Sequence, residues 1–154
     1  MASLTDPFSG QERFNAPPAK VYAVLTSFDT YAKAIPGLVS AEKAPDGESM
    51  KIAIKPALSF VSGTVKATMR ITDAKPDQGF IMTIESSSVG MTLDLEAGMD
   101  IVPEGGGAAT VVNWTGRVTK YSGLVKLAPA ALVRGSADKV IKDGWTELRK
   151  QIEA

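Results

Sequence analysis

Apolar and polar residues alternate through the middle of the chain, from about residue 38 to residue 119. The longest run covers 91–101, where every odd-numbered residue is apolar and every even-numbered residue is polar or glycine. Shorter runs cover 65–71, 80–84 and 112–118, and two further strands are expected near 38–43 and 50–55. Asp46-Gly47 and the Pro76–Gly79 stretch supply the turn residues of hairpins between strands. Such alternation is typical of an antiparallel sheet with one packed and one solvated face.

The segment before this alternation predicts one strand and two short helices. Phe8–Phe14 has the pattern of an edge strand. The two prolines that follow it, at 17 and 18, suit the first turn of a helix whose apolar positions recur at helical spacing as far as Phe28. Asp29-Thr30 can cap a second short helix, which extends to Ile35 and ends at the next Pro-Gly dipeptide.

A long amphipathic helix is the last element predicted, beginning near 124–129 and ending at Ile152. Its apolar positions recur at intervals of four and three residues and include Leu127, Ala131, Ile141, Trp145, Leu148 and Ile152. The apolar face of a single sheet must be covered, and only this helix is long enough to cover it. We therefore expect an α+β fold, a single domain over residues 1–154, in which a curved antiparallel sheet of about seven strands wraps around the C-terminal helix. A sheet with this curvature leaves a cavity where it meets the helix.

Composition narrows the possible functions. The 154 residues contain no histidine and no cysteine, which excludes thiol nucleophiles, Ser-His-Asp catalysis and Cys/His zinc sites. Seventeen basic residues balance 17 acidic ones, so there is no electrostatic reason to expect a nucleic-acid partner. No signal peptide and no apolar stretch long enough to cross a bilayer is present in the sequence, so we expect a cytoplasmic protein. The composition favours binding over catalysis, and we expect no metal or other cofactor.

Several short motifs, in this order, resemble those of the carbon monoxide dehydrogenase G-subunit family, whose members have the helix-grip fold of the START-like superfamily. The motifs are Phe14-Asn15-Ala16-Pro17 before Val21 and Leu25, Ile35-Pro36-Gly37, Asp46-Gly47, Phe60 with Gly63, the Thr110–Gly116 strand, and Gly123-Leu124 before the long helix. The resemblance covers nearly the whole chain. It implies the same fold as the hydrophobic pattern does, with two short helices after the first strand.

The resemblance also implies a function. Members of this family are encoded near carbon monoxide dehydrogenase and related molybdenum hydroxylases and are not catalytic subunits. The expected function is therefore binding of a lipophilic small molecule, a quinone or lipid, in service of such an enzyme. Some members carry a membrane-tethering extension that this sequence lacks, so at most transient membrane contact is expected. Two alternatives stay open: an adaptor or assembly factor that acts through its surface, and a cyclase or hydrolase of the same superfamily.

The candidate ligand-binding residues come from the inward-facing positions. They are Phe28, Tyr31, Ile35, Met69, Met82, Met91, Leu93, Trp114, Ala131, Arg134, Asp138 and Trp145. Methionine adapts to irregular apolar shapes, so the methionines suit a pocket, although the same pattern also fits a filled core. Arg134 and Asp138 interrupt the apolar stripe at a spacing that lets them pair, which indicates a polar or ligand-filled space beneath them. The alternative is a phase slip at Gly135 or a kink near Pro129 that turns both charges to solvent.

Charged residues on the outward strand faces need no ligand. Basic residues occur at Lys51, Lys55, Lys66 and Arg70, and acidic ones at Glu85, Asp94, Glu96 and Asp100. Cross-strand pairing on a solvated face is the expectation for them.

Overall fold

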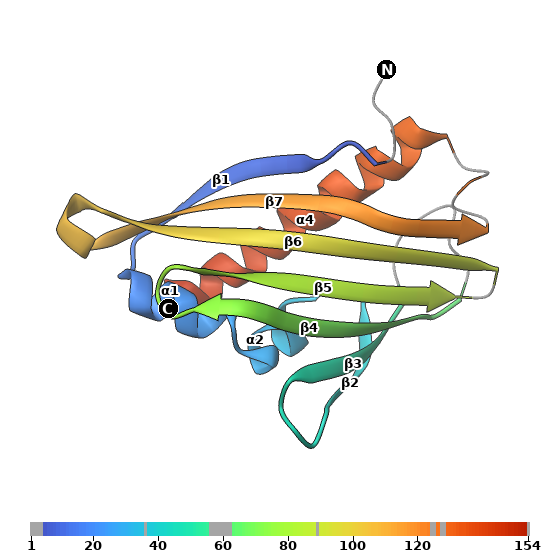
Figure 1. Cartoon of the computed structure of the whole chain (residues 1–154), viewed down its shortest axis with the longest axis horizontal. Helices are drawn as coiled ribbons and strands as arrows, with labels where there is room; N and C mark the ends of the chain where they lie inside the picture. The colour runs from blue at the N-terminus through green and yellow to red at the C-terminus, as the bar shows by residue number, and fades with distance from the viewer. Residues whose placement is uncertain are drawn as a thin grey trace.

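One seven-stranded antiparallel sheet forms most of the molecule, with the strand order β1-β7-β6-β5-β4-β3-β2 (Figure 1). The computed structural model describes residues 5–35, 37–55, 63–88, 90–123, 126 and 129–153. The strands are β1 (Phe8–Phe14), β2 (Leu38–Lys43), β3 (Ser49–Ile54), β4 (Val65–Lys75), β5 (Gly79–Ser88), β6 (Met91–Glu104) and β7 (Ala109–Gly123). The helices are α1 (Pro18–Leu25), α2 (Phe28–Ala34), the short 3-10 turn η1 (Gly105–Gly107) and α4 (Ala130–Ile152). The predicted helix-grip architecture is confirmed.

The helix boundaries differ in one place from the prediction. Phe28 does not continue the first helix but begins α2, and Ser27 occupies the N-cap position that was predicted for Asp29-Thr30. Helix α1 ends at Leu25, and the Tyr22 carbonyl accepts both the backbone N–H of Thr26, at 3.0 Å, and its hydroxyl, at 2.7 Å. Pro36, Phe60, Leu124 and Leu127, which contributed to the sequence pattern, lie outside the described residues.

Helix α4 lies behind the sheet and crosses it obliquely, with its C-terminal end beside α1 and α2 (Figure 1). The α4 backbone approaches α1 and α2 more closely than it approaches any strand. The three helices therefore cover one end of the inner sheet face tightly, while toward its N-terminal end α4 is the only described helix that covers it.

Among the residues that the structure describes, the buried apolar side chains form two separate clusters. We call the larger one the main cluster; it lies between α1, α2, the C-terminal half of α4 and the strands in front of them, and includes Phe14, Leu25, Met50 and Ile152. The second cluster is centred on Met91, Val118 and Val133 at the other end of α4. A sheet fully packed by one helix has a continuous core, so two clusters indicate incomplete packing between them.

Helix α4 also secures the edge strand β1. The guanidinium of Arg149 donates to the carbonyl oxygen of Arg13, and the Glu153 carboxylate accepts from the backbone N–H of Asn15 at 2.7 Å. At the other end of β1, Arg134 donates to the Asp6 carbonyl oxygen at 2.6 Å. These bonds satisfy backbone groups along an edge strand that would otherwise be open to pairing with another chain.

The described residues contain no helix that is both long enough and apolar enough to cross a membrane.

Candidate functional site

The candidate site is the space between the two clusters, on the inner face of the sheet. Gly116 of β7 lies in its wall, because it alternates with the core residues Val112 and Val118 and pairs with Ala97 of β6. A Cβ atom added at Gly116 would meet no atom of the described chain within 4 Å. Side chains in close-packed interiors contact neighbours on every side, so the described residues leave this position facing open space.

Partly buried residues of the inner face lie near Gly116 in the sheet or belong to the adjoining clusters. Ala97, which pairs with Gly116 on β6, is only partly buried although it belongs to an apolar stripe. Ile84 and Ile141, which pack against the main cluster, and Leu95, which packs against the second cluster, are also only partly buried. Partial exposure at inward-facing positions is expected where the helix and sheet leave a gap.

Two aromatic side chains stand beside the space on the main-cluster side. The Trp114 ring centroid is 6.2 Å from that of Trp145, which is 5.9 Å from that of Phe14. Gly10 of β1 pairs with Trp114, and its lack of a side chain makes room for the indole. The buried Nε1 of Trp114 has no hydrogen-bond partner among the described residues, whereas buried indole N–H groups usually have one.

A cationic group lies at the edge of the space. The Arg134 guanidinium carbon is 4.1 Å from the ring centroid of Phe8, a residue that pairs directly with Gly116 across the β1–β7 ladder. Stacking of arginine on an aromatic face is favourable and holds the guanidinium in place. A polar group of this kind beside an apolar space can orient the head group of a ligand.

Most of the candidate residues are placed in the two clusters. Phe28, Tyr31, Met69, Met82 and Trp145 are buried in the main cluster, with Ile35 and Trp114 packed against it. Met91 is buried in the second cluster and Leu93 packs against it. The methionines are thus close-packed core residues in this structure, and Trp114 is the candidate nearest to Gly116 along β7.

The helical candidates are arranged differently from the prediction. Ala131 is exposed, and the Asp138 carboxylate is half exposed and forms an ion pair with Lys142 at 3.0 Å. The apolar stripe of α4 that faces the sheet passes through Val133 and Ala137, and Ala131 and Asp138 lie to the side of this stripe. A regular helix accounts for this, without the kink or phase slip considered as the alternative, because α4 is continuous from Ala130 to Ile152.

Other residues of the site were missed by the sequence reasoning. Gly116 was assigned to a strand but not to the site, since a glycine provides no side chain to recognise. Tyr121 packs against the second cluster and pairs with Leu93, whereas the predicted alternation ended at Thr119. A bulge explains the omission: Asp94 pairs with Lys120 but the next residue, Leu95, pairs with Val118, so the inward positions of β7 shift by one.

Tyr31 is a structural residue of the main cluster. Its hydroxyl donates to the Leu25 carbonyl oxygen at 2.5 Å and links α2 to the end of α1. Burial raises the pKa of the Tyr31 hydroxyl above its ordinary value, so the group stays neutral and protonated. Elsewhere in the described chain, no group of three or more acidic residues is arranged to hold a metal ion.

Comparisons with solved structures agree with the helix-grip fold described above. A conserved protein from Geobacillus kaustophilus superposes with a TM-score of 0.85 at 20% identity, covering 96% of this chain and 95% of that chain. A protein from Chromobacterium violaceum gives a TM-score of 0.70 at 16% identity, with coverage of 97% and 99%. A START superfamily protein from Mycobacterium smegmatis gives 0.67 at 11% identity, with coverage of 95% and 96%. The chain has a helix-grip fold, and the fold is similar to that of this START superfamily protein.

A comparison of the sequence with models of protein families identifies the family of this chain. The family model of the carbon monoxide dehydrogenase G subunit (CoxG) matches residues 10–153. The chain belongs to this family, which confirms the resemblance found in its motifs. No curated protein gives a significant match.

Proposed function

We propose that this protein is a non-catalytic, cytoplasmic carrier that binds a quinone or another lipophilic molecule in the space between the sheet and α4. The observation that carries the proposal is the open space over Gly116 between two separate apolar clusters. Burial of apolar ligand area in such a space contributes about 25 cal/mol per Å² before the costs of association. The absence of histidine and cysteine from the sequence is consistent with binding in place of catalysis.

The polar groups around the space favour a ligand with an apolar body and a polar head. Arg134 lies at the rim over Phe8, and the indole of Trp114 provides a flat aromatic wall. A quinone ring can stack on such a wall, and its carbonyl oxygens can accept hydrogen bonds. Membership of the CoxG family supports a quinone that serves a carbon monoxide dehydrogenase or a related molybdenum hydroxylase.

Binding can be tested directly with the purified chain. Organic extracts analysed by mass spectrometry reveal a co-purified ligand, and titration with a short-chain ubiquinone analogue and with palmitate measures affinity. Both tryptophans of the sequence lie beside the space, so a bound quinone is expected to quench their fluorescence. No extractable ligand together with no binding at roughly tens of micromolar would overturn the proposal.

Two substitutions at neighbouring positions of β7 distinguish a ligand bound in the inner space from one bound on the outer surface. Gly116→Leu fills the space, whereas Thr115→Leu places the same side chain on the outer face, where Thr115 is exposed. We expect Gly116→Leu to weaken quinone binding by about tenfold or more and Thr115→Leu to leave it unchanged. Equal effects of the two variants would locate the ligand elsewhere.

The link to a molybdenum hydroxylase is tested by pull-down with the enzyme encoded nearby. Enzyme capture that persists in Gly116→Leu, together with absent quinone binding in the wild type, would favour the adaptor role through the protein surface. Capture that is enhanced by the quinone would support a carrier.

A further inference from the structure

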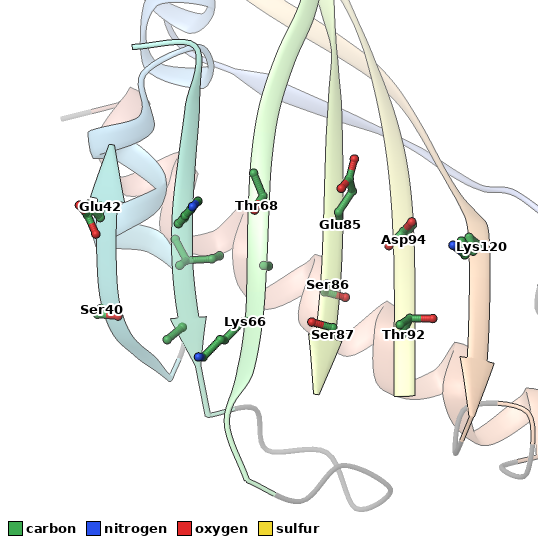
Figure 2. Close-up of a pocket in the computed structure, with 14 residues that line it drawn as sticks. Ser40, Glu42, Lys66, Thr68, Glu85, Ser86, Ser87, Thr92, Asp94 and Lys120 are labelled. Atoms are coloured by element: carbon green, nitrogen blue, oxygen red, sulfur yellow. The ribbon is translucent and has the colours of Figure 1, made fainter. Parts of the chain in front are cut away.

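The outer face of the sheet carries a polar trough that the proposed function does not use. It has a volume of about 460 Å³ and is formed by residues of β2 to β7 on the side away from α4 (Figure 2). Its charged residues are Glu42, Lys51, Lys66, Glu85, Asp94 and Lys120. No apolar side chain dominates this surface, so its recognition properties come from the charges.

Six of the outward side chains form a single row across the sheet. Each residue of the row pairs directly with the next on the neighbouring strand, in the order Glu42, Lys51, Thr68, Glu85, Asp94, Lys120. Figure 2 shows the labelled members of this row at one level across the strands. Neighbouring strands are about 4.8 Å apart, so the row is about 24 Å long.

The charges of this row have no ion-pair partners within the described chain. Other surface charges do: Arg117 pairs with Glu96 at 3.2 Å on the same face, and Lys43 pairs with Asp29 at 3.1 Å. The row also places the carboxylates of Glu85 and Asp94 directly opposite each other on β5 and β6. Like charges in this arrangement destabilise a sheet, so this part of the expectation of cross-strand pairing is wrong.

The row is complementary to the same row of a second copy read in the opposite direction. If a second copy of the row is turned end to end and laid over the first, Glu42 meets Lys120 of the other copy and Lys51 meets Asp94. At the centre, Thr68 meets Glu85, and a threonine hydroxyl can donate to a carboxylate. Every charge then faces an opposite charge or a hydroxyl, including the two carboxylates that repel each other in the single chain.

The neighbouring rows are compatible with the same arrangement. Lys66 pairs with Ser87 across β4 and β5, and Arg70 pairs with Thr83, so reversal about the same axis brings each cation over a hydroxyl of the second copy. The axis lies between β4 and β5 and runs along the strands, so the two sheets pack with aligned strands, which is a common geometry of face-to-face sheets.

We propose that two copies of this chain associate through the outer faces of their sheets, as a two-fold symmetric dimer centred between β4 and β5. A two-fold interface uses the same patch on both copies, which requires the self-complementary order found in this row. Exposed ion pairs are weak and screened by salt, so the dimer is in rapid exchange with the monomer and dissociates as ionic strength rises.

Sedimentation velocity of the full chain over a range of concentrations, at low and high salt, tests the dimer. We expect Lys51→Glu and Asp94→Lys each to weaken self-association by about tenfold or more, because each variant brings like charges together twice per dimer. An equimolar mixture of the two variants is expected to associate again to within about threefold of the wild type. In the mixed dimer, the glutamate introduced at position 51 of one chain faces the lysine introduced at position 94 of the other.

Matched controls carry the same changes in net charge. Arg70→Glu lies on the same face but meets a hydroxyl group of the second copy, and Glu147→Lys changes a partly exposed residue of α4, on the other side of the sheet, so both are expected to associate like the wild type. If one of the first two variants fails to fold by circular dichroism, Glu42→Lys and Lys120→Glu form a second complementary pair with the same expected outcomes.

Three results would overturn the proposal. The first is a wild-type chain that remains monomeric at low salt and at the highest concentration reached. The second is self-association that Lys51→Glu and Asp94→Lys leave unchanged. The third is a mixture of the two variants that does not associate more strongly than either variant alone, which would indicate a partner other than a second copy.

Discussion

Alanine substitutions at two glycines, Gly116 and Gly10, test the open space on which the proposed function depends. Both glycines lie on the inner face of the sheet in the paired strands β7 and β1, and neither has a positive φ. The same methyl group is therefore added twice to similar backbone positions. Only the surroundings of the added Cβ differ.

The surroundings predict opposite effects on stability. At Gly116 the Cβ meets no atom of the described residues within 4 Å, so the substitution gains about 0.4–1 kcal/mol by reducing the conformational entropy of the unfolded chain. At Gly10 it would lie 2.5 Å from Cζ2 and 2.7 Å from Cε2 of Trp114, which is too close for carbon atoms. The indole must shift, and overpacking of this kind costs about 1–3 kcal/mol, which exceeds the entropic gain.

Thermal and urea unfolding followed by circular dichroism measure both effects. For a chain of this size, 1 kcal/mol corresponds to about 2–4 °C in Tm. We expect Gly116→Ala to raise Tm by about 1–4 °C and Gly10→Ala to lower it by about 2–8 °C. Tryptophan fluorescence is a second readout, because a shift of the Trp114 ring changes its environment in Gly10→Ala only.

A Gly116→Ala variant that is as destabilised as Gly10→Ala would refute this reasoning. That result would mean that other atoms fill the space over Gly116, and the proposed ligand site would then have no room. A neutral Gly10→Ala would show instead that Trp114 moves without cost, and the aromatic wall would not be rigid.

Three further predictions concern the framework around the site. Burial raises the pKa of the Tyr31 hydroxyl, so its contribution to the free energy of unfolding is fully present below about pH 10 and is lost as pH rises through the folded-state pKa. Tyr31→Phe is expected to lower the free energy of unfolding by about 1 kcal/mol at neutral pH, because the bond to Leu25 is lost, and to show a shallower alkaline decline in urea titrations. Arg149→Lys is expected to lower Tm by about 2–6 °C in thermal unfolding, because lysine cannot reproduce the planar fork that bonds β1; an unchanged Tm would contradict this. Val133→Ala is expected to cost about 1–2 kcal/mol and to speed amide exchange in the first turns of α4, while Leu132→Ala, at an exposed position, is expected to do neither.

Much of the fold was predictable because hydrophobic periodicity is a local property. The run over 91–101 alternates strictly and forms most of β6, and the Asp46-Gly47 turn connects β2 to β3 as expected. The first error, at Phe28, concerns a helix boundary, because the backbone leaves the helical conformation at Thr26 and Ser27 although the apolar spacing continues to Phe28. Such a break is not visible in a pattern of apolar positions.

The site was less predictable because it depends on how elements meet. The space over Gly116 depends on how β1, β6 and β7 meet α4, which no local pattern specifies. Arg134 was expected on the helix face toward the sheet, and in the structure it reaches the side chain of Phe8 and the Asp6 carbonyl on the β1 side. The charged row on the outer face also required the strand register, since pairing of Glu85 with Asp94 depends on both strands.

The pairing of β1 with β7 has a consequence for synthesis of the protein on the ribosome. Phe14 at the end of β1 pairs with Thr110 of β7, so about 95 residues must be translated before β1 can join the sheet. At about 5–20 residues per second, β1 waits on the order of 5–20 seconds for β7, its neighbour in the described sheet, and the α4 arginines that bond to its ends arrive later still. During this interval β1 is an unpaired strand on the nascent chain, and its backbone groups are open to pairing with another chain.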